Sequence, residues 1–132
     1  MKVILNKCYG GFDVSYKAYM LYAKKKGIKI YCYRNDTDAY HKVNREDGRF
    51  VNYFMKDFGE KVGSRDFDWD YCLYLDEGHR EDPVLVEVVE ELGKEASGHF
   101  GNLVVVDIPD GLDYVIDEYD GIETLHEKVR TW

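Results

Sequence analysis

The sequence predicts one α+β domain, with a mixed β-sheet of about five or six strands, two main helices on one face and a C-terminal β-hairpin. The prediction rests on short β-branched and aromatic runs, two amphipathic segments with helix start and stop residues, and an Asp-Gly pair between two apolar runs. With 132 residues, of which 45% are hydrophobic and 33% charged, the chain can bury a core without disulfides. We therefore expect residues 1–132 to form a single domain.

The N-terminal part predicts a strand, a helix and a second strand. Residues 3–5 are β-branched and aliphatic, and residues 28–33 alternate between apolar and polar side chains. The helix is expected over 14–26, because three lysines and a glycine mark its end and Asp13 or Ser15 can cap its start. A helix between two strands favours parallel pairing with a right-handed crossover, which we expect here.

The middle of the chain is less well marked. Residues 34–48 are polar and predict the one long loop, a kind of segment that often carries function. Residues 50–55 and 71–75 are rich in aromatic and aliphatic side chains, so each predicts a strand. The alternating acidic residues between Asp66 and Glu77 resemble a calcium loop only superficially, because Tyr71 stands where that loop requires glycine.

The C-terminal half has the clearest signals. Asp82 can cap a helix whose first position is Pro83 and whose apolar face continues to Leu92. Residues 103–108 are almost all apolar and predict a buried strand. Asp120-Gly121 predicts the turn of a hairpin. The strands of that hairpin are expected at 114–116 and 122–125.

Charge and composition exclude several classes of function. The net charge of −8 disfavours direct binding to nucleic acid or to anionic membranes, and no apolar run is long enough for a signal peptide or a membrane span. We expect a cytoplasmic protein. Cys8, Cys32 and Cys72 are too widely spaced for a zinc site or a disulfide framework, and the four histidines show no metal-ligand spacing, so no metal and no cofactor are expected.

Aromatic residues are unusually abundant. They make up 15% of the sequence, and 12 of them are tyrosines. Tyrosine suits recognition surfaces, because its ring packs while its hydroxyl finds a polar partner, although tyrosines can equally fill the faces of a sheet. Together with Trp132 at the end of the sequence, this surplus predicts a homo-oligomer.

Four strings of the sequence resemble a family of small proteins from tailed phages and prophages. They are Ile4–Phe12, Arg80–Val86, Val106–Gly111 and Ile116–Glu123. The resemblance leaves out residues 36–70 and carries no agreed activity, so it transfers no catalytic residue. Because small phage proteins often oppose host defence, it implies by analogy a Thoeris-type inhibitor that sequesters a signal such as a cyclic ADP-ribose.

One group of residues is predicted to bind a small anion. The segment from Cys8 to Phe12 lies before a predicted helix, where free N–H groups can hold a phosphate, and Arg80 can grip the same group with two hydrogen bonds. A Gly-Gly turn that only reverses the chain, and an Asp82 that only caps a helix, are the simpler alternatives. The expected ligand-binding residues are Cys8, Tyr9, Gly10, Gly11, Phe12, Arg34, Arg80 and Asp82.

The sequence therefore predicts a phage-encoded binding protein, not an enzyme, that captures a small nucleotide-like host signal between aromatic rings and arginines. Two alternatives stay open. The acidic residues between Asp107 and Glu127 could bind a basic host protein, although they could equally form a solvated face. An enzyme acting on the same nucleotide is the other alternative.

Overall fold

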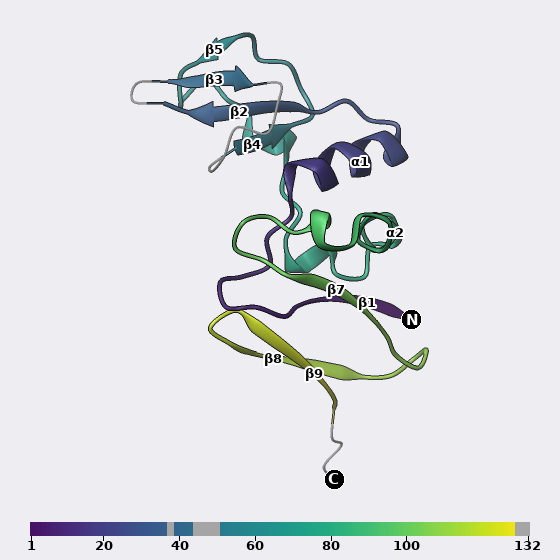
Figure 1. Ribbon diagram of the computed structural model, residues 1–132. Coiled ribbons are helices and arrows are strands. Elements are labelled where there is room, and N and C mark those ends of the chain that lie inside the picture. Colours follow the sequence, from purple (N-terminus) through teal and green to yellow (C-terminus); the bar gives the residue numbers. More distant parts are fainter. Residues whose placement is uncertain (37–38, 44–50, 129–132) are drawn as a thin grey trace. The chain divides into compact units, whose positions relative to one another are not determined.

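The computed structural model describes residues 1–36, 39–43 and 51–128, which form an α+β structure with two α-helices and a C-terminal hairpin, as predicted (Figure 1). Its helices are α1 (Tyr16–Lys26) and α2 (Pro83–Leu92). Its strands are β1 (Lys2–Asn6), β2 (Tyr31–Asn35), β3 (Tyr40–Val43), β4 (Val51–Phe54), β5 (Lys61–Val62), β6 (Cys72–Leu73), β7 (Leu103–Asp107), β8 (Tyr114–Tyr119) and β9 (Ile122–Glu127). They form sheets of five, two and two strands instead of the single sheet that we expected.

The chain divides into two compact units. The first comprises residues 1–22 and 75–132, and the second residues 23–74. Each unit has buried hydrophobic residues of its own. That the whole chain folds as a single domain stays a prediction.

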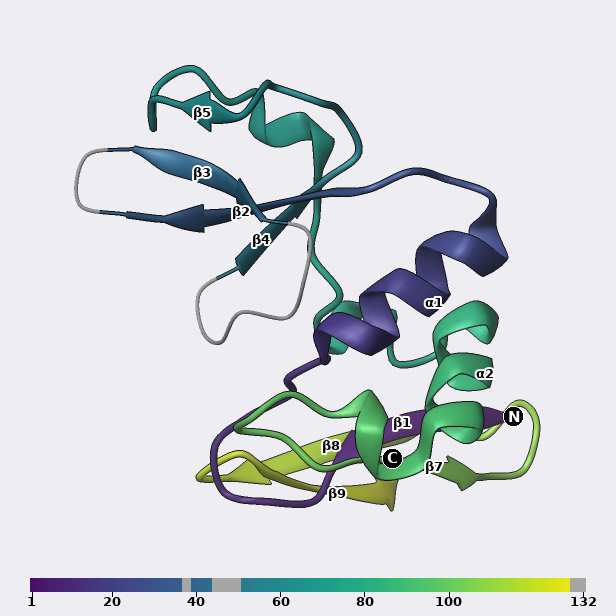
Figure 2. The ribbon, with the colours of Figure 1, turned by 45° about the horizontal axis from the view of Figure 1, so that its top comes forward.

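In the first unit, β1 and β7 pair antiparallel and α2 lies against both strands (Figures 1 and 2). The register runs from Lys2 opposite Asp107 to Asn6 opposite Leu103. The central residues of β1 are almost completely buried, which shows that both faces of this strand are covered. The apolar face of α2 supplies Leu85, Val86, Val88 and Val89 to the same core.

The helix ends follow the sequence signals. Asp82 caps α2 by accepting a hydrogen bond from the Val84 N–H, and Gly93 ends it with a φ of 58°. Ser15 is the residue that caps α1, because its Oγ accepts from the Ala18 N–H at 3.1 Å. Asp13 instead accepts a hydrogen bond from the Phe100 N–H at 3.1 Å, so its carboxylate joins two loops of the first unit.

The predicted C-terminal hairpin is confirmed. β8 and β9 pair antiparallel from Tyr114 opposite Glu127 to Tyr119 opposite Ile122. Asp120 and Gly121 form the two-residue turn, and both have positive φ angles, of 48° and 93°. Positive φ at both positions is the requirement of a type I′ turn, which Asp-Gly satisfies.

In the second unit, five strands form an antiparallel sheet in the order β5-β3-β2-β4-β6. The expected parallel pairing of residues 3–5 with residues 28–33 is therefore wrong, because β1 pairs with β7 while β2 pairs with β3 and β4. Residues 34–48 do not form one long loop either, since they contain β3; residues 37–38 and 44–48 of this segment lie outside the described residues.

Aromatic rings fill the core of the second unit. Tyr33, Phe54 and Phe67 are buried with Val62, and the rings of Phe54 and Phe67 stack with centroids 4.5 Å apart. The Tyr33 hydroxyl donates a hydrogen bond to the Gly59 carbonyl and accepts one from the Phe58 N–H, each at 2.9 Å. Part of the tyrosine surplus thus belongs to the core, which is the simpler of the two interpretations of the composition.

Candidate functional site

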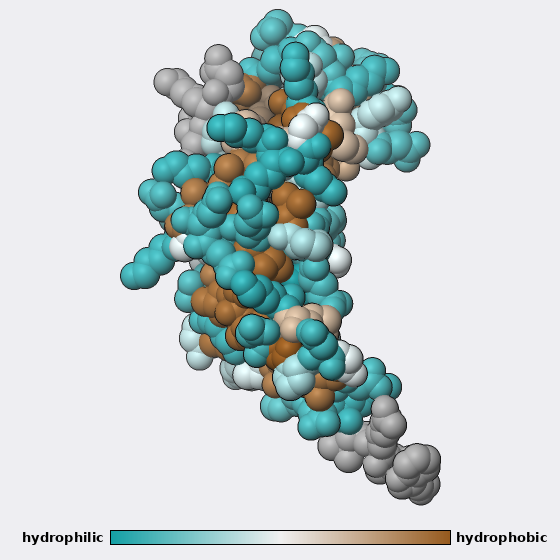
Figure 3. Space-filling view, turned by 90° about the vertical axis from the view of Figure 1, so that its right-hand side faces the viewer, coloured by the Kyte–Doolittle hydropathy of each residue, from teal (hydrophilic) through white to brown (hydrophobic). Residues whose placement is uncertain are grey.

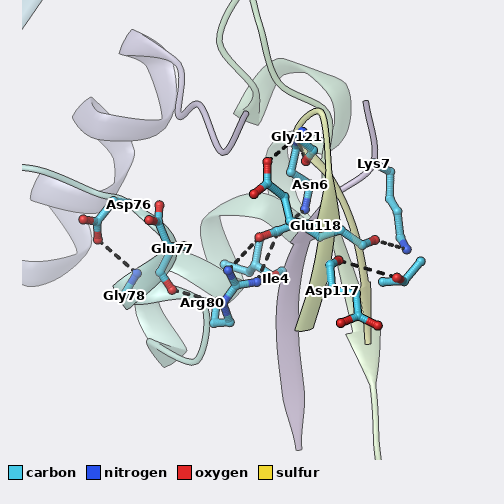
Figure 4. A network of polar contacts seen from close by, with 12 residues as sticks. Ile4, Asn6, Lys7, Asp76, Glu77, Gly78, Arg80, Asp117, Glu118 and Gly121 are labelled. Carbon is cyan, nitrogen blue, oxygen red and sulfur yellow. Dashed lines mark hydrogen bonds and ion pairs between the residues drawn. The ribbon is translucent and has the colours of Figure 1, made fainter. Parts of the chain in front are cut away.

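Arg80, the first candidate for an anion ligand, lies beside the edge of β1 in the first unit (Figure 4). The Ile4 N–H donates to the Arg80 carbonyl at 2.9 Å, and Arg80 Nη1 donates to the Ile4 carbonyl at 3.1 Å. Two residues further along β1, the Asn6 N–H donates to Glu123 Oε1 at 2.8 Å. Arg80 and Glu123 therefore satisfy backbone groups of β1 that a neighbouring strand would otherwise bind.

The guanidinium of Arg80 is also paired with the carboxylate of Glu123. Nη1 and Nη2 donate to the two carboxylate oxygens at 3.2 and 2.8 Å, and Nε donates to the Glu77 carbonyl at 3.1 Å. Only 14% of the Arg80 side chain and 9% of the Glu123 side chain are exposed. Because Glu123 neutralises this charge and holds both terminal nitrogens, the arrangement suits an internal ion pair better than an anion-binding group.

The Gly10-Gly11 turn uses its N–H groups within the first unit. The Gly10 N–H donates to the Asp120 carbonyl at 2.9 Å, and the Gly11 N–H donates to the Phe100 carbonyl at 3.2 Å. A Cβ on Gly121 would lie 2.6 Å from the carbonyl carbon of Gly10, and a Cβ on Gly10 would overlap the Phe100 carbonyl oxygen. Glycine is therefore required at positions 10 and 121 because backbones approach each other closely there, not because the turn binds a phosphate.

Each of the three backbone segments that meet at this point carries an exposed aromatic ring. Tyr9 is 68% exposed, Phe100 is 52% exposed and Tyr119 is 74% exposed. We call these three residues the aromatic corner. Since exposed aromatic rings are common at recognition surfaces, the corner is the candidate binding surface of the first unit.

The other predicted ligand residues have different positions. Cys8 is half-buried, with its Sγ 3.3 Å from the Phe100 carbonyl oxygen, and Phe12 lies under the Arg80 guanidinium at 5.6 Å from the ring centroid. Asp82 caps α2 and accepts a hydrogen bond from the Tyr22 hydroxyl at 2.6 Å. Arg34 belongs to β2 of the second unit. The structure therefore places Phe12 against Arg80, while the Cys8 to Gly11 segment contacts Phe100 and Asp120 and Asp82 has the capping role of the simpler alternative.

The shifted pKa values belong to groups that stabilise the fold. Burial, and then the hydrogen bond to Asp82, raise the pKa of Tyr22 far above its ordinary value. Burial alone raises the pKa of the Cys32 thiol to about 12, which keeps it protonated and unreactive at neutral pH. Within residues 1–36, 39–43 and 51–128, no group of three or more acidic, histidine or cysteine side chains could hold a metal ion.

Sequence reasoning missed Glu123, Phe100 and Tyr119. The sequence shows Glu123 only as part of a generally acidic segment, but it is a buried carboxylate on the inward-facing side of β9. The alternation of apolar and polar residues does not indicate this, because Glu123 directly follows the half-buried Ile122 and consecutive strand residues point to opposite faces. No local pattern indicates that the backbone of Phe100 and that of Asp120, next to Tyr119, would meet the turn that follows Tyr9.

None of the helices in the described part of the chain is long and apolar enough to cross a membrane. No protein-family model, no curated protein and no solved structure matches this chain.

Proposed function

We propose that this protein is a non-enzymatic binding module that docks the aromatic corner on a basic partner protein. The observation that carries the proposal is the meeting of three backbone segments, each with an exposed ring, in an acidic molecule of net charge −8. Exposed Tyr and Phe rings offer apolar area and faces for cation–π contacts with Lys or Arg. Carboxylates next to the rings would favour the same cationic side chains.

Charged residues adjoin the corner in the sequence and in space. Asp120 follows Tyr119 directly, is exposed, and accepts the Gly10 N–H through its carbonyl, which leaves its carboxylate in solvent. Glu118 precedes Tyr119 and accepts a hydrogen bond from the Gly121 N–H at 2.9 Å, so its carboxylate is held beside the turn. An aromatic surface with carboxylates at its margin is complementary to a partner that presents Arg or Lys among apolar residues.

A second candidate is capture of a nucleotide-derived host signal, as expected for a phage protein that opposes a Thoeris-type defence. The same three rings favour it, because a base can stack on any aromatic face. The internal pairing of Arg80 with Glu123 weighs against it, since the ligand would have to find its positive charge elsewhere. This candidate therefore comes second.

A selection from a displayed library of random peptides tests the first proposal. Peptides that bind the wild-type protein should be rich in Arg or Lys next to apolar residues. They should lose at least about 30-fold in affinity for the variant Tyr9→Ala/Phe100→Ala/Tyr119→Ala, because loss of one well-packed ring typically costs about 2 kcal/mol. Tyr74→Ala is the matched control, since Tyr74 is also 68% exposed but belongs to the second unit.

Two results would overturn the docking proposal. Selected peptides could lack basic residues, or they could bind the triple variant as well as the wild type. For the second candidate, a panel of nucleotide second messengers is added and the melting temperature is measured. A shift that the triple variant loses, with the ligand recovered intact after heating, would favour capture; a chemically changed ligand would indicate an enzyme.

A further inference from the structure

The outer edge of β7 in the first unit is a row of backbone groups that β1 does not use. The Lys7 N–H donates to the Asn102 carbonyl and the Ile108 N–H donates to the Met1 carbonyl, each at 2.8 Å. The backbone N–H and C=O groups of the even-numbered residues from 102 to 108 therefore point toward β1. The odd-numbered residues therefore face away from it. Among them, the Leu103 N–H donates to Ser97 Oγ at 2.7 Å. Within the described residues, the outward N–H and C=O of Val105 have no hydrogen-bond partner.

The other strand edges carry features that discourage further pairing. In the first unit, Arg80 and Glu123 occupy the edge of β1. The hairpin strands carry exposed charges, Asp117 and Glu118 on β8 and Glu127 on β9. In the second unit, both edge strands of the five-stranded sheet are only two residues long. Short strands, charges and covering groups are the usual means by which proteins protect sheet edges.

In β7 these features occur only at the two ends, where Ser97 Oγ holds the Leu103 N–H and Asp107 carries a charge. Its sequence is Leu-Val-Val-Val-Asp, without proline or lysine, and its three valines are only half-buried. Figure 3 shows that hydrophobic side chains reach the surface of the protein between hydrophilic ones. A five-residue, β-branched edge with open backbone groups is a template for one more strand.

We infer that this strand is β7 of a second copy of the chain, paired antiparallel about a two-fold axis at Val105. In that register Val105 lies opposite its own counterpart, Val104 opposite Val106, and Leu103 opposite Asp107. The two Val105 residues then exchange hydrogen bonds through their outward N–H and C=O groups. The two Asp107 carboxylates lie at opposite ends of the pair, where the Leu103 N–H stays with Ser97 Oγ. Shifting the register toward the C-terminus would bring in Pro109, which has no N–H to donate, and would finally place Asp107 opposite Asp107.

The strength of the dimer follows from its size and charge. Two five-residue strands bury less than the ~1,200 Å² of a stable interface, so the association should be weak, with a dissociation constant in the micromolar range or above. Each copy carries a net charge of −8, which opposes association. Salt screens this repulsion, so the dimer should become more abundant between about 0.02 and 0.5 M NaCl, the opposite of an interface held together by ion pairs.

Sedimentation velocity of the full chain at about 5–500 µM tests the pairing. The wild type should shift from monomer to dimer with concentration and with salt. Val105→Pro should stay monomeric at every concentration, because it removes an outward N–H that β1 does not need and places a ring in the path of the incoming strand. Its circular dichroism should remain that of the wild type. A wild type that stays monomeric at 500 µM in 0.5 M NaCl, or a Val105→Pro variant that dimerises equally well, would overturn the inference.

Disulfide trapping tests the register, in a background in which Cys8, Cys32 and Cys72 are replaced by Ala. Directly opposed hydrogen-bonded residues have Cα atoms about 5.5 Å apart, within the range of a disulfide. Val105→Cys should therefore form a covalent dimer at least about 10-fold faster than Val104→Cys, whose two copies would lie more than about 7 Å apart. Equal rates, or a faster reaction of Val104→Cys, would contradict pairing about Val105.

Discussion

Replacing Arg80 with Met should destabilise the first unit by about 3–5 kcal/mol, because it leaves the Glu123 carboxylate buried without its cation. The carboxylate is 9% exposed and would retain only the Asn6 N–H as a hydrogen-bond donor among the contacts described above. The same change removes the donor to the Ile4 carbonyl. The perturbation therefore acts on the edge of β1 as well as on the ion pair.

The double-mutant cycle with Glu123→Gln separates these effects. Glu123→Gln alone should cost about 1.5–3 kcal/mol, since the side chain keeps an oxygen for the Asn6 N–H but no longer neutralises Arg80. The double variant buries no unpaired charge, so it should be more stable than the sum of the two losses predicts. We expect a coupling free energy of about 2–3 kcal/mol.

Urea unfolding followed by circular dichroism measures the free energies, and hydrogen exchange at the Asn6 amide reports on the edge of β1 directly. The control pair is Lys2→Met with Glu90→Gln in the same unit. Its N–O distance is 2.9 Å, but its side chains are 49% and 44% exposed, so the coupling should not exceed about 1 kcal/mol. A coupling below about 0.5 kcal/mol for Arg80 and Glu123, or unchanged exchange at Asn6 in Arg80→Met, would refute the reasoning.

Three further changes probe other contacts. Gly121→Ala should cost at least about 2 kcal/mol more than Gly111→Ala in urea unfolding, because both glycines have positive φ but only Gly121 touches another backbone; equal losses would contradict the close approach. Tyr33→Phe should lose about 1–3 kcal/mol, since its hydroxyl satisfies two backbone groups, and a loss below 0.5 kcal/mol would show that water replaces it. Burial raises the pKa of Cys32 to about 12, so the stabilisation by its protonated thiol is complete below the pKa of the unfolded chain and is lost as the pH rises toward 12. The urea midpoint should therefore fall between pH 8 and 11 by more in the wild type than in Cys32→Ala, and parallel curves would contradict a buried thiol.

Local elements could be predicted where a few neighbouring residues determine them. Asp82 and Pro83 begin α2, and Asp120-Gly121 forms the hairpin turn, because capping and turn formation depend on side chains and backbone angles within four or five residues. The α+β class follows from the same signals. Strand partners could not be predicted in this way: β1 pairs with β7, about a hundred residues later, although the sequence favoured pairing with the next strand.

The candidate site also has features that local sequence predicts and features that depend on residues distant in the sequence. The sequence predicts a special role for the Gly10-Gly11 turn, but the close approach of Gly10 to Phe100 and Gly121 depends on three segments that fold together. The aromatic corner exists only because those segments meet.

By itself, the sequence determined where the helices and the C-terminal hairpin form, since those choices depend on contacts within one or two turns of chain. Only the tertiary structure decided the role of Arg80. Whether the charge of Arg80 can bind a ligand or is neutralised within the protein depends on whether a carboxylate lies next to it. The fold places Glu123, 43 residues later in the sequence, beside Arg80. Hydrogen bonds and ion pairs have a reach of a few ångströms, so a partner distant in sequence becomes visible only when the chain has folded.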